Sequence, residues 1–96
     1  MNAAGAPLLL QGRVLDAQGR GVAGARIAWV AGPVPLPDIA LLSGADGRFT
    51  LAAPQPGRYS LRADAEASDG TALQAQATLQ LPADDGGALL LQLRQR

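Results

Sequence analysis

Acidic side chains offer the first candidates for chemistry. Between residues 64 and 69 the chain carries Asp, Glu, Ser and Asp at short intervals, and calcium binds several carboxylate or carbonyl oxygens at short range. The spacing does not fit an EF-hand, because Asp69 stands where the turn glycine belongs and Ala75 where the bidentate acid belongs. We expect solvated turn acids, with a looser calcium site at this loop or at Asp84-Asp85 as the alternative.

The residue types on which most enzymes rely are missing. The 96 residues include no histidine and no cysteine, which excludes the usual hydrolytic triads, most zinc or iron sites, disulfides and thiol chemistry. A paired-carboxylate hydrolase would need two acids fixed in a cleft, whereas every acid in this chain lies in or beside a turn-like stretch. We predict that the chain is not an enzyme and that it has no catalytic, cofactor-binding or metal-binding residue.

The basic residues are eight arginines that balance eight acids and form no run, so nucleic-acid binding is not expected. No apolar run approaches the roughly 20 residues that span a bilayer, and no direct membrane insertion is expected. Arg48, Arg58 and Arg62 are predicted to share one outward face, where they would form a cationic patch for an acidic glycan or partner. The alternative is a solvated sheet face that blocks edge aggregation.

The elements that position these arginines are two strands within residues 44–63. Asp46-Gly47 and residues 54–57 carry turn signals. With the two-residue period of a strand, one face holds four large apolar side chains, Phe49, Leu51, Tyr59 and Leu61, and the other holds the arginines. The pattern predicts a half-buried antiparallel hairpin made of these two strands.

The rest of the chain reads as further short strands, predicted over residues 8–15, 25–30, 39–43, 71–81 and 88–94. Residues 71–81 contain good helix formers, but leucine and alanine alternate there with glutamine and threonine, which favours a strand. The proline-rich segment 32–37 is predicted to be a stiff extended connection. Strands at this spacing are typical of a sandwich or barrel.

Four blocks in order, residues 12–19, 22–27, 45–51 and 56–61, resemble the carboxypeptidase regulatory-like domain. The resemblance implies an all-β, seven-stranded Greek-key β-sandwich of the transthyretin-like or immunoglobulin-like kind. It also implies a module within a larger secreted, periplasmic or cell-surface protein. Gly21 departs from the family, which commonly has proline there. We expect one domain over residues 7–96, preceded by a segment 1–6 that is disordered or added to the native chain.

Leucines near both chain ends suggest a covered surface. The runs Leu8-Leu9-Leu10 and Leu89-Leu90-Leu91 are apolar on both faces of their strands, and a strand covered on one side only does not need that. Leu9 and Leu90 are the outward members. The cover is a homodimer mate, a neighbouring domain of a parent protein, or a loop of the same domain.

We therefore expect a non-catalytic module that serves as a structural spacer, stabilising or protein-interaction domain. Its partners would be other domains of a parent protein, a protein partner or a second copy, outside the cytoplasm. The alternative is a carbohydrate-binding accessory module, which normally stacks exposed aromatic rings on sugars. Trp29 and Tyr59 are the candidates for that role, and both are predicted to face inward.

Overall fold

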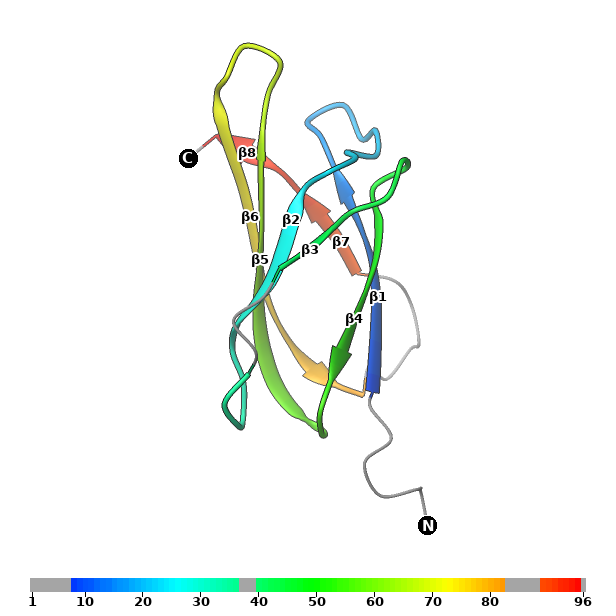
Figure 1. The fold of residues 1–96 in the computed structure, drawn as a ribbon, viewed down its shortest axis with the longest axis vertical. Coiled ribbons are helices and arrows are strands. Elements are labelled where there is room, and N and C mark those ends of the chain that lie inside the picture. The colour runs from blue at the N-terminus through cyan, green and yellow to red at the C-terminus, as the bar shows by residue number, and fades with distance from the viewer. Residues whose placement is uncertain (1–7, 37–39, 83–88, 96) are drawn as a thin grey trace.

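The computed structural model describes residues 8–36, 40–82 and 89–95, which form two β-sheets facing each other (Figure 1). One sheet has the strand order β4 (Arg48–Ala53), β1 (Leu8–Leu15), β7 (Leu89–Gln92). The other has the order β3 (Leu41–Leu42), β2 (Arg26–Ala31), β5 (Gly57–Glu66), β6 (Ala72–Leu81), β8 (Arg94–Gln95). No helix occurs among the described residues, so the prediction of an all-β sandwich is confirmed at that level. The predicted boundary at residues 1–6 lies outside them.

The described residues form eight strand pieces, where seven strands were expected. The extra piece arises at the C-terminus, where β7 lies in the three-stranded sheet and β8 in the five-stranded one, with Leu93 alone between them. Leu93 is buried, and its N–H donates to the carbonyl of Leu15 over 2.8 Å. A single C-terminal segment thus contributes to both sheets.

The predicted hairpin of the two central strands is wrong. β4 pairs antiparallel with β1, whereas β5 pairs with β2 and β6, so the connection between β4 and β5 crosses from one sheet to the other. The alternation itself is correct, since Phe49, Leu51, Tyr59 and Leu61 are all buried. A period of two specifies which face is buried but not which strand lies alongside, and two strands facing each other across a core show the same pattern as two paired strands.

The strand predicted over residues 71–81 is confirmed as β6. It pairs with β5 over ten consecutive residues without a register shift. Its apolar face is turned inward but only Leu81 is fully buried, while Leu73 and Leu79 are half-buried. Packing of alternate apolar residues therefore prevails over the helical propensity of Ala, Leu and Gln.

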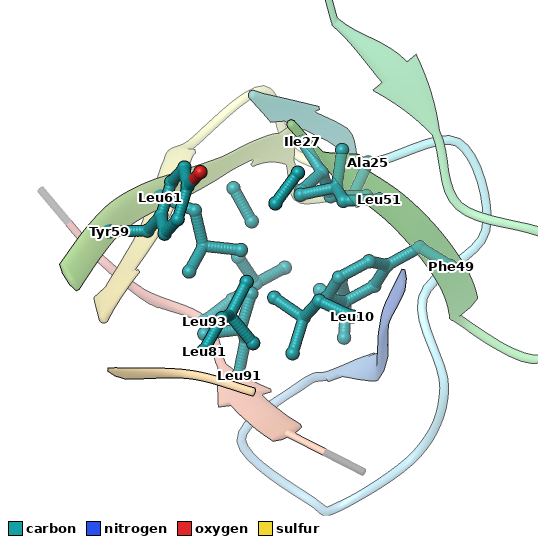
Figure 2. Packing of buried hydrophobic residues seen from close by; sticks show 13 residues of the cluster. Leu10, Ala25, Ile27, Phe49, Leu51, Tyr59, Leu61, Leu81, Leu91 and Leu93 are labelled. Atoms are coloured by element: carbon teal, nitrogen blue, oxygen red, sulfur yellow. The ribbon is translucent and has the colours of Figure 1, made fainter. Parts of the chain in front are cut away.

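The core is formed by apolar side chains that both sheets direct into the space between them (Figure 2). Phe49 covers the backbone of its cross-strand neighbour Gly12 so closely that a Cβ at Gly12 would lie 2.3 Å from Cζ of the ring. On the opposite sheet Trp29 packs against Tyr59 with ring centroids 4.8 Å apart. The indole Nε1 donates to the carbonyl of Ala52 over 3.1 Å and so links β2 to β4.

The Asp46-Gly47 turn is confirmed and is held tightly. Gly47 donates to the carbonyl of Gly44 over 2.9 Å, and its own carbonyl accepts from the N–H of Val14 over 2.8 Å. Gly47 has φ +87°, and a Cβ there would lie 2.4 Å from the carbonyl oxygen of Val14. On the other side a Cβ at Gly21 would overlap the carbonyl of Asp46. Glycine at 21, where the family commonly has proline, therefore lets this turn pack closely.

Candidate interaction surface

The outer face of the three-stranded sheet brings together three of the five residues predicted to form an interaction surface. We call this surface the three-strand face. It consists of the outward residues of the three strands: Leu9, Gln11, Arg13 and Leu15 of β1, Arg48, Thr50 and Ala52 of β4, and Leu90 and Gln92 of β7. Arg58 and Arg62 belong to β5 in the other sheet.

Leu9 and Leu90 are both exposed on this face, at 61% and 62%. They do not adjoin each other. Leu90 lies beside Arg13 in the parallel pairing of β1 and β7, whereas Leu9 is four residues earlier along β1, which is about 13 Å along the strand. The face therefore carries two exposed leucines that are separate from each other. Among the described residues nothing pairs with β1 beside Leu9 on the β7 side, because the register of β7 begins opposite Gly12.

The end of the face near Leu90 is cationic. Arg48 and Arg13 are directly opposite each other on β4 and β1, so Arg48, Arg13 and Leu90 form one row across the sheet. Both arginines are anchored to Asp46: Nε of Arg48 lies 3.0 Å from Oδ2 of its carboxylate, and Nε of Arg13 donates to its carbonyl over 2.8 Å. The side chain of Arg48 is 77% exposed, whereas Arg13 is half-buried.

A shallow hollow of about 460 Å³ lies over this row. Its lining comes from β1, β4 and β7: Gln11, Gly12, Arg13, Arg48, Phe49, Thr50 and Leu90. Gly12 contributes no side chain. The hollow offers guanidinium groups and one leucine to a ligand, which suits an apolar group accompanied by a carboxylate.

The prediction that Arg58 and Arg62 share a face with Arg48 is wrong. They extend from the outer face of the five-stranded sheet, on the opposite side of the sandwich. Arg62 is paired with its own strand, with Nε 2.9 Å from Oδ2 of Asp64. Arg13 was missed as a member of the cationic row, because its place beside Arg48 depends on the pairing of β1 with β4, which the alternation of each strand does not reveal.

The two aromatic candidates for sugar stacking are engaged inside the domain. Tyr59 is buried, as predicted, and its hydroxyl donates to the carbonyl of Gln55 over 2.7 Å, an arrangement similar to the tyrosine corner of β-sandwiches. Trp29 is half-buried rather than buried, with its ring against Tyr59 and its Nε1–H donating to Ala52. These contacts give the carbohydrate-binding alternative no support.

The acidic loop considered for calcium is built from local turn contacts. Asp64 binds Arg62, and Oδ1 of Asp69 accepts the N–H of Thr71 over 2.9 Å. The hydrogen bonds from the side chain and the backbone of Thr71 lower the pKa of Asp69 below its ordinary value of 3.8. Within residues 8–36, 40–82 and 89–95 no three acidic side chains gather closely enough to hold a metal ion. Asp84-Asp85 lies outside the described residues.

Comparison with known proteins identifies one match. The family model of the carboxypeptidase regulatory-like domain matches residues 10–94, which is most of the chain. The match includes the four blocks on which the sequence resemblance rested. No significant match is found among curated proteins or among solved structures. In the part of the chain that the structure describes, no helix has the length and apolarity needed to cross a membrane.

Proposed function

Because the chain belongs to the carboxypeptidase regulatory-like domain family, we propose that it is a non-catalytic module whose role is carried by its surface. The role is that of a spacer, stabilising or protein-interaction domain in a larger secreted or cell-envelope protein. The match over residues 10–94 supports the non-catalytic assignment. The observation that carries the interaction role is the exposure of Leu9 and Leu90 on the same face of one sheet.

The surface assigned to docking is the three-strand face. Leu90 beside Arg13 and Arg48 offers a protein partner one apolar contact flanked by two guanidinium groups. An arginine that binds a carboxylate in a bidentate manner adds orientation to such a contact. The matching partner is therefore a neighbouring domain or protein that presents an apolar side chain next to acidic ones.

We also propose that the eight strand pieces correspond to the seven strands of a Greek-key arrangement, with β7 and β8 as one strand bent at Leu93. The single residue between these pieces supports this correspondence. Under this proposal the number of strands is the seven that the family resemblance implies.

Photo-crosslinking in source cells tests the docking role. A photoreactive amino acid replaces Leu9, Leu90 or, as the matched control, Leu42, which is 65% exposed but lies on β3 in the other sheet. We expect crosslinks to a protein or to another domain of the same polypeptide from Leu9 and Leu90 and none from Leu42. Equal crosslinking at all three positions would contradict the assignment.

Fractionation of source cells tests the setting. An immunoblot with serum against this domain reads apparent mass and compartment together. A band well above the mass of this domain, in the envelope or the medium, is expected. A band at the mass of the isolated domain in the cytoplasmic fraction would overturn the proposed parent protein and its location.

A further inference from the structure

The second half of β6 has an unpaired edge. β6 pairs with β5 along its whole length, but on its other side β8 covers only Leu73 and Gln74. Among the described residues nothing pairs with Ala75–Leu81 on that side. In an antiparallel strand every second residue directs its N–H and C=O away from a given neighbour. On the side of β6 that faces away from β5, these donors and acceptors have no partner among the described strands over residues 75–81. Figure 1 shows β6 beside β5 in the five-stranded sheet.

This edge lacks the features that usually prevent strands from pairing with other chains. Natural edges are protected by charge, proline, bulges or short length. Residues 75–81 contain no charged residue and no proline, and their register with β5 has no shift. The long edge of β4 begins with Arg48, β7 has four residues, and β3 and β8 have two residues each. Within the described sheets, β6 is thus the edge that is long, flat and uncharged.

We propose that the free edge of β6 pairs antiparallel with the same edge of a second copy, joining the two five-stranded sheets into one continuous sheet. A two-fold axis normal to the sheet requires one residue to lie opposite its own copy. Thr78, in the middle of Ala75–Leu81, gives the full overlap of seven residues. In this register the outward pairs are Gln76 with Gln80 and Thr78 with Thr78, and the inward pairs include Ala77 with Leu79.

The side chains on both faces are compatible with this pairing. Every residue of the stretch is uncharged, so no like charges meet, and glutamine and threonine side chains can hydrogen-bond across strands. On the inner side Ala77 and Leu79 are only half-buried in the single domain. Each would gain an apolar neighbour from the other copy, which removes surface from water.

A groove lies beside the first part of the free edge. A groove of about 320 Å³ lies between β6 and the C-terminal segment, lined by residues 74–77 on one side and Leu90, Leu91, Gln92 and Arg94 on the other. β7 forms the other wall of this groove, so a second copy has to enter the groove to reach residues 75–77.

Paired charges on the outward positions test both the contact and its register. In Gln76→Glu/Gln80→Glu each new carboxylate lies opposite one of the other copy, but within its own chain it lies opposite Arg62 or Arg58 of β5. The variant therefore repels the second copy without placing like charges together in its own fold. In Gln76→Glu/Gln80→Lys, each new glutamate lies opposite a new lysine of the second copy.

Sedimentation equilibrium over a range of protein concentrations measures the outcome. We expect the wild-type chain to approach twice the monomer mass with rising concentration, with at least tenfold weaker association in Gln76→Glu/Gln80→Glu and recovery in Gln76→Glu/Gln80→Lys. Circular dichroism confirms that both variants are folded. A monomeric wild type, or equal association of the wild type and the double-glutamate variant, would overturn the proposal.

The self-association through β6 can be tested separately from the docking role proposed for the three-strand face. Leu9→Arg lies on the other sheet, outside the groove beside β6, and should leave this self-association unchanged. If Leu9→Arg abolishes it and Gln76→Glu/Gln80→Glu does not, the two copies meet through the three-strand face and the pairing of β6 is wrong.

Discussion

At the scale of single residues, two glycines show different reasons for lacking a side chain. One is required only by its backbone conformation, and the other also by the atoms packed around it. Gly19 and Gly47 both have a positive φ, +83° and +87°, but a Cβ at Gly19 would meet nothing within 4 Å. A Cβ at Gly47 would lie 2.4 Å from one backbone atom and 2.8 Å from another, the carbonyl of Val14 and the N–H nitrogen of Val22. These two atoms are joined by a hydrogen bond of 2.9 Å, from the N–H of Val22 to the carbonyl of Val14, so they cannot withdraw without straining or breaking it.

We therefore expect Gly47→Ala to reduce the free energy of unfolding by more than Gly19→Ala. Gly19→Ala should cost about 1 to 2 kcal/mol for the left-handed conformation, and Gly47→Ala about 1 to 3 kcal/mol in addition for overpacking. Urea denaturation followed by circular dichroism measures both values. Similar losses in the two variants would show that the contacts around Gly47 adjust freely.

The turn acid Asp69 provides a pH-dependent test at the same scale. Its pKa is lowered by the hydrogen bonds from the Thr71 side chain and backbone, so the folded state favours the ionised form more than the unfolded chain does. The resulting stabilisation is fully present above the unfolded value, near 3.8, and is lost as the pH falls through the folded pKa.

Thr71→Val removes the side-chain hydrogen bond and keeps the backbone one. We expect the Asp69 midpoint, followed by carboxyl carbon NMR, to lie below 3.8 in the wild type and to move upward in this variant. Thr78→Val serves as the control, because it removes a threonine hydroxyl from the second half of β6, far along the chain from Asp69. A wild-type midpoint at or above the ordinary value would contradict the assignment.

At the scale of elements, the sequence predicted strands well and their partners poorly. The bounds of β1 and the inward face of β6 follow from alternation, because one face of each strand must be buried. The error concerned β4 and β5, which are joined by a short turn yet lie in different sheets. The pairing of β4 with β1 depends on contacts between residues distant in sequence, so no local sequence pattern predicts it.

The same limit explains what was found of the surface. Leu9 and Leu90 could be identified because a leucine on the outward side of a strand is visible in the sequence itself, and both are exposed. The neighbourhood of Arg48 could not be identified without the register that places Arg13 opposite it. The division of the last strand into β7 and β8 was also hidden, since Leu89, Leu91 and Leu93 continue one alternation across the change of sheet.

At the scale of the whole molecule, the two sheets share one core. Leu10, Phe49 and Leu91 come from the three-stranded sheet, and Tyr59 and Leu61 from the five-stranded sheet (Figure 2). The indole of Trp29 adds a hydrogen bond from one sheet to the other. Neither sheet keeps its inner face covered without the other, so we expect them to unfold together.

Phe49→Ala tests this coupling. Removing the ring should cost about 3 to 5 kcal/mol, because it leaves a cavity between the sheets and uncovers Gly12. Thermal unfolding is followed by Trp29 fluorescence, which reports on the five-stranded sheet and its contact with β4, and by far-ultraviolet circular dichroism, which reports on all strands. We expect one coincident transition in the wild type and a lower but still coincident one in Phe49→Ala. Separate midpoints for the two probes would mean that one sheet survives alone, and the shared core could not then be the main source of stability.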